Sequence, residues 1–324
     1  MSCWNFAETV YRLGEGPTAD HPALIHDDLI ISYGELRHRA SGIASYLNSL
    51  ALPAGSHVGH YLRNSNAYME MFVGSGLAGH AHVNVNYRYR DEELIGLANG
   101  LDLRVLVYDA EFADRVAAIR DRLEATVAFI EVGGDEPVAD FAVSLVSLYD
   151  HATDDFQTST SSDDLVLIAT GGTTGLPKGT QWRNEDLWRK MGTSTQMALE
   201  PLQLKDHPTE LAEHVSNVGS LPSPPAFLSL SPLMHGAGLM TAILMIAQGV
   251  PVATVSGVKF DPDATLSFIK QHGVGCVVLV GDAFGTPLVD ALDKRADEKL
   301  IASLMVLISS GASLGPETRA GLQR

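Results

Sequence analysis

The sequence contains only two cysteines, Cys3 and Cys276, which lie far apart in the chain. Two such residues supply neither a disulfide framework nor the clustered spacing of a metal site, so we expect a reducing compartment, the cytoplasm. Long apolar runs are also missing. The longest, residues 239–255, is interrupted by Gln248 and Pro251 and falls short of the roughly 20 apolar residues that span a membrane. A buried helix followed by a strand is expected there, and no integral membrane segment.

Basic residues are scarce, with 22 lysines and arginines against 39 acidic residues and a formal net charge of −17. Such a charge repels nucleic acid and anionic membranes, so nucleic acid is not an expected partner. A ligand with several phosphates must therefore be held by local donors rather than by a basic surface. The first residues, Met-Ser-Cys-Trp-Asn-Phe-Ala-Glu, show neither the basic region nor the apolar core of a signal peptide.

Apolar residues make up 45% of the chain and charged residues 19%, which is typical of a globular protein. Short apolar runs alternate with segments of helical pattern. This alternation predicts an α/β protein with parallel sheets covered by helices on both faces. The predicted strands are residues 58–62, 81–85, 105–108, 127–132, 165–169, 227–230, 250–255, 276–280 and 304–309.

Two predicted helices carry boundary signals. Ser32 begins a capping box ahead of a helix that reaches about Leu50, and Asp261 and Gly273 are of the residue types that begin and end a second helix. The segment 199–225 shows no periodicity and mixes proline, serine, histidine and acidic residues. A long irregular segment in a compact domain is typical of a functional loop or a junction.

We therefore expect two α/β halves that pack together. The first is residues 1–200 and contains the glycine-rich segment 169–179, and the second is residues 201–324.

The most informative segment is Ala169-Thr-Gly-Gly-Thr-Thr-Gly-Leu-Pro-Lys-Gly179, which directly follows an apolar run. Glycines allow backbone N–H groups to approach an anion closely, and the hydroxyl and ammonium groups add further donors. The segment indicates a phosphate-binding loop, although a glycine-rich turn without a ligand has the same composition. It is not a Walker loop, because Lys178 lies between Pro177 and Gly179 instead of preceding a serine or threonine.

This string resembles the phosphate loop of the adenylate-forming enzymes, the family of acyl-CoA synthetases, luciferases and peptide-synthetase adenylation domains. The family pattern is Tyr-Thr-Ser-Gly-Thr-Thr-Gly-x-Pro-Lys-Gly, and this chain has Ala169 in place of the aromatic residue and Gly171 in place of the serine. The resemblance implies the fold of the large N-terminal domain of these enzymes, in which two parallel-sheet subdomains pack together. It also implies ATP, Mg²⁺ and coenzyme A, with a small carboxylic acid as the substrate.

The same resemblance implies roles for the residues of the segment. ATP binding is implied for Thr170, Gly171, Gly172, Thr173, Thr174, Gly175 and Lys178. The last four of these would hold the β- and γ-phosphates. Thr170 would also help to ligate Mg²⁺.

A second motif, Ser229-Leu-Ser-Pro-Leu-Met-His-Gly-Ala-Gly238, lies between a predicted strand and a predicted helix. A polar ring at a strand end is where α/β proteins place ligands, but a lone histidine in apolar surroundings is often only structural. The motif resembles the family's Pro-Leu-x-His-x-x-Gly element, which implies that His235 and Gly236 line the acid pocket. Its form is similar to that of a branch of acyl-CoA synthetases that accepts long-chain or steroid side-chain acids.

The turn Ser310-Gly311-Ala312 by itself indicates only a tight strand-to-helix connection. Its similarity to the family's Ser-Gly-Gly-Ala-Pro-Leu element implies that Gly311 and Ala312 lie beside the adenine and the acyl group. The stretch Asn84-Val-Asn-Tyr-Arg-Tyr-Arg90 is similar to the family's Pro-Val-Asn-Pro-Arg. Hydrogen bonding at a polar strand end explains it, and we assign it no catalytic role. His80 and His82 lack a third ligand in view, so no metal site is predicted there.

The resemblance runs from about Trp4 to the last residue, Arg324. By that resemblance the Tyr-Gly-x-Thr-Glu segment and the lysine of adenylation would follow the last residue, so no catalytic residue is assigned. We expect the full-length enzyme to join a carboxylic acid to AMP and to pass the acyl group to coenzyme A. We expect this segment alone to bind ATP weakly or not at all and to form no acyl-CoA.

An alternative interpretation is a non-catalytic binding or regulatory module derived from such a ligase. A phosphate-loop kinase or other NTPase is disfavoured by the absence of Gly-Lys-Ser/Thr, and hydrolase chemistry by the absence of a Gly-x-Ser-x-Gly elbow. The sequence does not indicate the acid or the oligomeric state.

Overall fold

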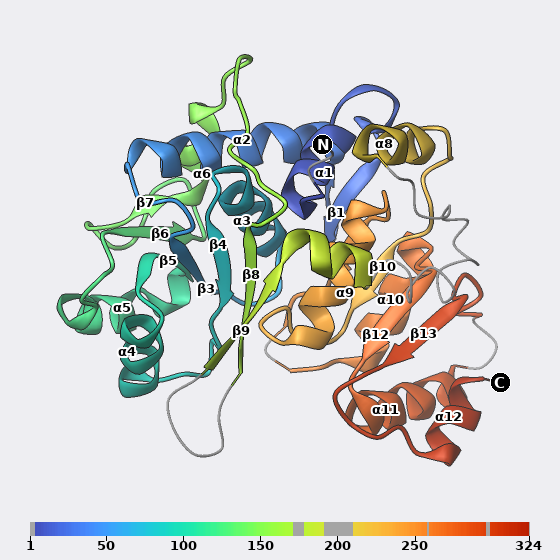
Figure 1. The fold of residues 1–324 in the computed structure, drawn as a ribbon. Helices are drawn as coiled ribbons and strands as arrows, with labels where there is room; N and C mark the ends of the chain where they lie inside the picture. The colour runs from blue at the N-terminus through green and yellow to red at the C-terminus, as the bar shows by residue number, and fades with distance from the viewer. Residues whose placement is uncertain (1–3, 171–177, 191–209, 258, 296–298, 324) are drawn as a thin grey trace.

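The computed structural model describes residues 4–170, 178–190, 210–257, 259–295 and 299–323, and it contains two sheets (Figure 1). The seven-stranded sheet has the order β7 (Val143–Ser144), β6 (Ala128–Val132), β5 (Leu103–Asp109), β3 (His57–Tyr61), β4 (Ala81–Asn84), β8 (Leu165–Thr170) and β9 (Lys178–Arg183). The six-stranded sheet has the order β13 (Val306–Ser309), β12 (Cys276–Leu279), β10 (Phe227–Ser229), β11 (Val252–Thr254), β1 (Pro22–His26) and β2 (Leu29–Ser32).

Both sheets are parallel except at one edge each. Strand β9 pairs with β8 in the antiparallel sense, and β2 pairs with β1 in the same way. The predicted α/β class with two parallel sheets is therefore confirmed. All nine predicted strands form, with ends within two residues of the predicted ones. Strands β1, β2, β7 and β9 were not predicted, because they are short or, in β9, mostly polar.

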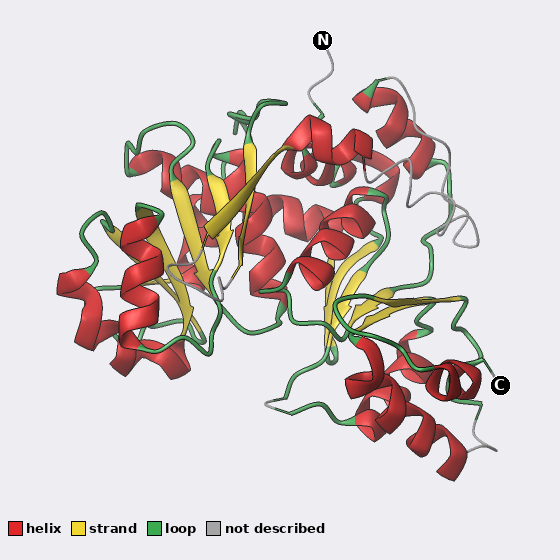
Figure 2. Cartoon of the chain, turned by 60° about the horizontal axis from the view of Figure 1, so that its bottom comes forward, coloured by secondary structure: helices red, strands yellow, loops and turns green. Residues whose placement is uncertain are grey.

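The helices form three layers around the two sheets (Figure 2). Between the sheets lie α1 (Phe6–Leu13), α2 (Tyr33–Ser49), α3 (Asn66–Leu77) and α9 (Gly236–Ala247), which share one apolar core with the inner faces of both sheets. The outer face of the seven-stranded sheet is covered by α4 (Asp91–Gly100) and α5 (Ala113–Ile119). The outer face of the six-stranded sheet is covered by α10 (Pro262–His272), α11 (Gly281–Lys294) and α12 (Pro316–Leu322).

The remaining elements lie at the periphery. They are α6 (Leu145–Leu148), α8 (Leu211–Gly219), a helix over residues 184–190, and 3-10 turns at Gly16–Thr18, Ala110–Phe112, Arg120–Arg122 and Tyr149–His151. Helix α8 lies inside the segment predicted to be irregular, of which residues 199–209 are outside the described ranges.

The predicted helix boundaries are confirmed. The Ser32 hydroxyl accepts a hydrogen bond from the Glu35 N–H at 3.2 Å, and the Asp261 carboxylate accepts one from the Ala264 N–H at 3.0 Å. Gly273 ends α10 with a φ of 59°, a conformation that glycine adopts without strain. The long apolar stretch forms α9 and then β11, as expected. In the ranges that the structure describes, no helix is both long and apolar enough to cross a membrane.

The two sheets do not separate at residue 200. Strands β1 and β2 come from the start of the chain, and Leu24 pairs with Val252 in the sheet built mostly by the second half. The Tyr33 hydroxyl also donates a hydrogen bond to the Ile246 carbonyl at 2.7 Å, which ties α2 to α9. The two sheets share the apolar core that lies between them. The division of the chain into halves 1–200 and 201–324 stays a prediction.

Candidate functional site

Two cavities lie where the carboxyl ends of parallel strands from both sheets come together. In α/β proteins this is the edge at which ligands bind, because loops there are free to vary above a fixed sheet. The smaller cavity has a volume of about 160 Å³ and the larger one about 460 Å³. The smaller is lined by Asn84, Asn86, Tyr89, Leu97, Ile168, Ala169, Met234, His235 and Gly236.

The smaller cavity brings together residues of the segments 169–179 and 229–238, which are far apart in the sequence. Ala169, which leads into the glycine-rich segment, lies at the end of β8, and His235 precedes α9 in the other half. His235 and Gly236 were predicted to line one pocket, and both contribute to this cavity. Their role toward an acid stays a prediction.

Asn84, the last residue of β4, fixes this juxtaposition. Its side-chain oxygen accepts a hydrogen bond from the Ala169 N–H at 2.7 Å, and its amide donates to the Ala169 carbonyl at 3.1 Å. The same amide also donates to the Met234 carbonyl. One buried side chain thus holds the entry to the glycine-rich segment and the residue before His235. The hydrogen-bonding role expected for a polar strand end is confirmed, but the sequence did not show which segments it joins.

A second asparagine, Asn64, acts in the same way beside β4, after the neighbouring strand β3. Asn64 follows β3, and its side-chain oxygen accepts a hydrogen bond from the Leu233 N–H at 2.7 Å, while its amide donates to the Ser231 carbonyl at 3.4 Å. The segment before His235 is therefore held at two points by residues of the seven-stranded sheet. Sequence reasoning missed Asn64, although an asparagine three residues after the end of a buried strand was a usable signal.

His235 stands at the N-terminus of α9 with an extended backbone, and its carbonyl accepts the Leu239 N–H at 3.0 Å. Its ring is partly exposed, and desolvation, with a smaller contribution from the positive charge of Arg88, lowers the pKa of His235 below its ordinary value. The ring is therefore neutral at pH 7. Gly238 is needed for a steric reason, because a Cβ there would lie 2.7 Å from the Ser231 carbonyl oxygen. A Cβ at Gly236 would meet only ordinary contacts.

The glycine-rich segment itself is only partly described. Thr170 ends β8 and Lys178 begins β9, and these two residues are paired across the antiparallel ladder. The predicted ATP-binding residues Gly171, Gly172, Thr173, Thr174 and Gly175 lie outside the described residues.

Gly311 and Ala312 follow β13 and contribute to neither cavity. Gly311 has a φ of 89°, which marks a tight turn, and the neighbouring Ser310 N–H donates to the Leu279 carbonyl at 3.0 Å. The role of both residues beside adenine stays a prediction.

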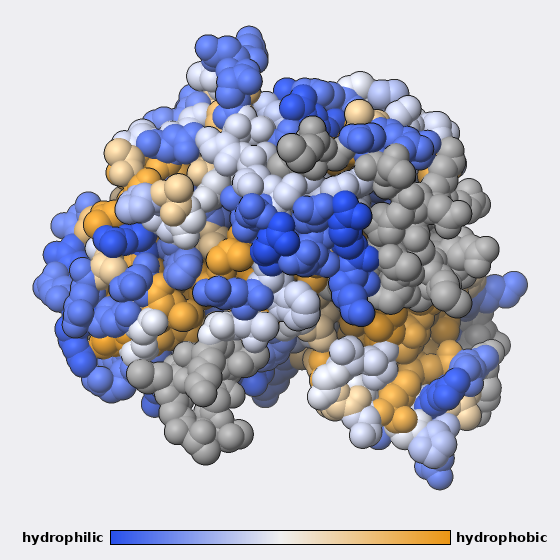
Figure 3. Space-filling view, viewed as in Figure 1, coloured by the Kyte–Doolittle hydropathy of each residue, from blue (hydrophilic) through white to orange (hydrophobic). Residues whose placement is uncertain are grey.

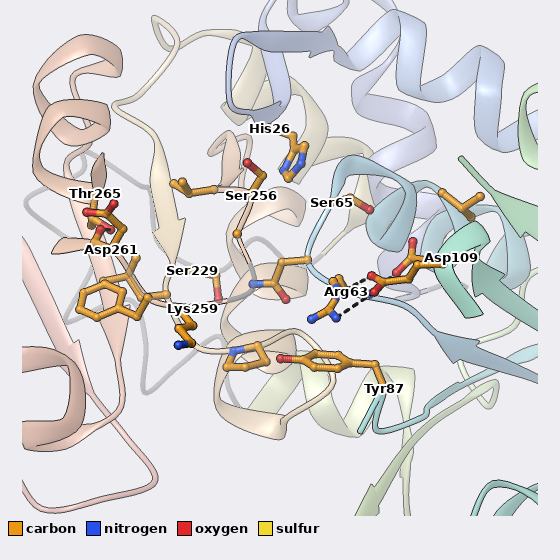
Figure 4. Close-up of a pocket in the computed structure, with 18 of the residues that line it drawn as sticks. His26, Arg63, Ser65, Tyr87, Asp109, Ser229, Ser256, Lys259, Asp261 and Thr265 are labelled. Carbon is orange, nitrogen blue, oxygen red and sulfur yellow. Dashed lines mark hydrogen bonds and ion pairs between the residues drawn. The ribbon is translucent and has the colours of Figure 1, made fainter. Parts of the chain in front are cut away.

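The larger cavity is the polar cleft shown in Figure 4. Arg63, Arg88 and Lys259 contribute positive charge to it, and Tyr87 and Phe260 contribute aromatic walls. The Arg63 guanidinium forms an ion pair with Glu111 and lies 4.7 Å from the centre of the Tyr87 ring. No carboxylate of the described residues lies within ion-pair distance of Arg88 or Lys259. Three carboxylates, those of Asp109, Glu111 and Asp261, also line the cleft, and of the three cations Arg88 and Lys259 are the ones left without an ion pair among the described residues.

Asp109 lies at the end of β5 on the wall of this cleft. Its carboxylate accepts a hydrogen bond from the Arg63 N–H at 2.7 Å. Burial raises the pKa of Asp109 to about 6, and the charge of Glu111 adds to the effect. A carboxyl group with such a pKa in a cleft is a typical feature of functional sites.

The described residues do not by themselves form a metal site. They contain no group of three or more histidine, cysteine, aspartate or glutamate side chains that could hold an ion. The hydroxyl of Thr170 is the hard oxygen donor that Mg²⁺ prefers, and Mg²⁺ is commonly held by few protein ligands together with substrate phosphates. The role of Thr170 toward Mg²⁺ stays a prediction.

The fold and the motifs define an AMP-binding enzyme. Residues 14–324 match the family model described as AMP-binding enzyme, and the chain belongs to that family. It is 31% identical over 314 residues to a medium/long-chain-fatty-acid/3-oxocholest-4-en-26-oate–CoA ligase of Mycobacterium marinum, with 94% of this chain and 55% of that protein covered. It is 29% identical over 309 residues to the 3-oxocholest-4-en-26-oate–CoA ligase of Rhodococcus rhodochrous, with 92% and 54% covered. The chain spans about half the length of these curated relatives.

Solved structures share the fold at lower identity. An anthranilate–CoA ligase in complex with anthranoyl-AMP superposes with a TM-score of 0.82 at 17% identity, covering all of this chain and 58% of that one. A long-chain-fatty-acid–CoA ligase of Archaeoglobus fulgidus superposes with a TM-score of 0.80 at 18% identity, covering 98% and 60%. The predicted resemblance to the N-terminal portion of fatty-acid–CoA ligases is confirmed.

Proposed function

We propose that this chain carries the phosphate-loop half of an AMP-forming acid–CoA ligase that acts on a long-chain or steroid-type acid. The observation that carries the proposal is the cavity in which Asn84 holds Ala169, at the entry to the glycine-rich segment, against the segment that ends in His235. The curated relatives that are ligases of fatty and 3-oxocholestenoic acids support the substrate class. The −17 charge supports a small-molecule substrate over nucleic acid.

In the proposed reaction a carboxylate oxygen of the acid attacks the α-phosphorus of ATP, and pyrophosphate leaves. The thiol of coenzyme A then attacks the acyl carbon of the resulting acyl-AMP, and AMP leaves. Two anions must be brought together in the first step, so catalysis depends on orientation and on donors around the phosphates. Thr173, Thr174, Gly175 and Lys178 would hold the β- and γ-phosphates, and bound Mg²⁺ would neutralise part of their charge.

His235 would then shape the acid side of the smaller cavity. A neutral ring adds no charge to that cavity, which suits an apolar acyl group beside it. We propose that the larger cleft, with Arg63, Arg88 and Lys259, takes the phosphate-bearing end of coenzyme A. A reducing, cytoplasmic compartment fits the buried thiol of Cys276 and is also a proposal.

Because this segment alone is expected to bind ATP weakly or not at all, binding is tested in a longer polypeptide that contains it, by titration calorimetry with ATP and with a non-hydrolysable acyl-sulfamoyl adenosine. His235→Ala is expected to weaken binding of the acyl analogue about tenfold and to leave the affinity for ATP unchanged. Lys178→Ala is expected to weaken the binding of ATP. His38→Ala, on the exposed side of α2, is the matched control. Equal effects of His235→Ala and His38→Ala would contradict the assignment of the acid pocket.

Turnover is tested by pyrophosphate release from the 324-residue chain with a panel of long-chain and steroid acids. We expect little or none from this segment alone, because the lysine of adenylation is not assigned to any of its residues. Turnover comparable to that of full-length relatives would contradict this expectation. Tight binding of the acid without turnover, even when the chain is part of a longer polypeptide, would favour the alternative of a binding or regulatory module.

A further inference from the structure

Two histidines form a buried pair beneath the candidate site. His60 on β3 is fully buried and His82 on β4 is 2% exposed, and their ring centres lie 4.4 Å apart with the planes nearly perpendicular. Tyr68 and Phe72 of α3 close over them, with the Tyr68 ring centre 5.4 Å from His60 and the Phe72 ring centre 5.5 Å from His82. The pair therefore sits in the contact between the middle of the seven-stranded sheet and the helix layer.

The rings have almost no polar partners. Both ring nitrogens of His60 and Nδ1 of His82 are buried with no hydrogen-bond partner in the described part of the chain. The remaining nitrogen, Nε2 of His82, lies 3.2 Å from the Tyr68 hydroxyl. A neutral imidazole tolerates such surroundings, but a protonated one would place an unpaired charge in an apolar core. Burial accordingly lowers the pKa of both histidines, that of His82 to about 3, and a charge on His82 lowers the pKa of His60 further.

Among the described residues, no carboxylate forms an ion pair with either ring. On the flanking strands the register places Val107 of β5 beside His60 and Val166 of β8 beside His82. On α3 the only carboxylate, Glu70, is engaged by Arg39 and by the Tyr149 hydroxyl.

Directly before β4 lies a further titratable group, His80, whose Nδ1 is also buried without a partner among the described residues. Asp164, before β8, lies with His80 and His82 around a void of about 10 Å³, and its carboxylate accepts hydrogen bonds from Asn5 and from the Ser161 N–H. A proton that reaches the pair therefore meets another histidine and an engaged carboxylate.

The pair is coupled directly to the candidate site through the strands that carry it. His60 is the register partner of Asn84, and its carbonyl accepts the Val85 N–H at 3.1 Å. His82 lies two residues before Asn84 on the same strand, and it pairs with Val166 of β8, the strand that leads to Ala169. A change in packing at the pair would be transmitted along β4 to the hydrogen bonds between Asn84 and Ala169.

We propose that the His60–His82 pair is an acid-sensitive lock on this site: uptake of a proton by either ring separates α3 from β3 and β4 and releases the Asn84–Ala169 junction. The inference rests on the packing alone and does not depend on the identity of the acid. The direction of the pH effect on stability follows from the linkage between proton binding and folding. Groups that stay neutral in the folded state and charge in the unfolded state stabilise the fold above the ordinary histidine pKa of about 6.5, and this contribution is lost as pH falls below it.

The first test is urea unfolding from pH 8 to pH 5 of the wild-type chain, His60→Leu and His57→Leu. Below pH 6.5 each buried histidine raises the unfolding equilibrium constant about tenfold per pH unit, so the pair raises it about a hundredfold. In His60→Leu the unfolding equilibrium constant is expected to rise only about tenfold per pH unit below pH 6.5, because one of the two buried histidines has been removed. His57→Leu is the matched control, since His57 lies on the same strand but reaches solvent. Parallel pH profiles of wild type and His60→Leu would overturn the proposal.

A second measurement needs no core substitution. In the wild-type protein, NMR of labelled histidine rings should show that the His60 and His82 signals do not titrate between pH 8 and 5.5 while the fold persists. Over the same range, the hydrogen-exchange protection of the Ala169 amide, which donates to Asn84, should fall more than that of Leu106 in β5. Ordinary titration of both rings, or equal loss of protection at the two amides, would overturn the proposal.

Discussion

Strands β4 and β13 are both four residues long and both end in a polar residue, Asn84 or Ser309, but their surroundings differ. All four residues of β4 are buried, whereas all four of β13 are only half-buried. Strand β4 lies between β3 and β8 with α3 above it, and β13 pairs with β12 alone. In residues 301–323 no side chain is buried, and Figure 3 shows apolar surface over the part of the molecule where Figure 1 draws β12 and β13. The number of covered faces, not residue type, sets how much a strand contributes to stability.

The largest effect is expected at the polar residue that ends each strand. Asn84→Ala removes the hydrogen bonds of Asn84 to the Ala169 N–H and carbonyl, which are half-buried, and to the Met234 carbonyl, which is buried, and this is expected to cost about 3 kcal/mol of unfolding free energy. Ser309→Ala at the end of β13 removes one hydrogen bond, from the Gly281 N–H at 3.2 Å, and is expected to cost less than about 1 kcal/mol. Urea unfolding of both variants measures the difference. Equal costs would show that the two strand ends are equally important.

A smaller effect is expected from the same deletion on neighbouring strands. Val278 of β12 is fully buried, so Val278→Ala should cost about 2 kcal/mol through lost transfer energy and the resulting cavity. Val306 of β13 is only half-buried, and Val306→Ala should cost under about 1 kcal/mol. Urea unfolding of both variants under the same conditions compares their losses of unfolding free energy. A larger loss at Val306 would mean that β13 is covered in solution.

The pH dependence of two aspartates should differ in sign. Asp109, near the centre, has its pKa raised to about 6 by burial, so its folded form keeps the proton longer than the unfolded form does. The stability that this group contributes is present below pH 4 and is lost as the pH rises through 6. Asp109→Asn should therefore stabilise the protein at pH 7.5 by about 1–2 kcal/mol, a figure that allows for solvent screening. At pH 4 the variant and the wild type should have the same urea midpoint.

Asp282, near the outer edge, shows the opposite behaviour and the smallest effect. The Gly315 N–H donates to its carboxylate at 2.9 Å and lowers the pKa of Asp282. Its contribution is present at neutral pH and is lost as pH falls below the ordinary aspartate value. Asp282→Asn should thus lower the urea midpoint slightly at pH 7 and not at pH 3. A rise in the midpoint at pH 7 would contradict the assigned direction.

Much of the fold could be predicted from local pattern. The nine apolar strands follow from their hydrophobic runs, and Ser32, Asp261 and Gly273 follow from the chemistry of helix ends. Strands β1 and β2 could not be placed, because a short hairpin far from its partners carries no signal for pairing with β11. Long-range pairing depends on which faces remain to be covered after the other elements have packed.

The sequence by itself determined the family and the chemical character of this protein. The glycine-threonine segment and the His-Gly-Ala-Gly motif are local features of the sequence, and they point to the AMP-binding family that the family model confirms. Only the tertiary structure decided that Asn84 and Asn64 hold the two motifs together, and that His60 and His82 meet in an apolar core. The reason is physical, since a hydrogen bond or a buried charge depends on what surrounds a side chain in space, and residues 150 positions apart supply that surrounding.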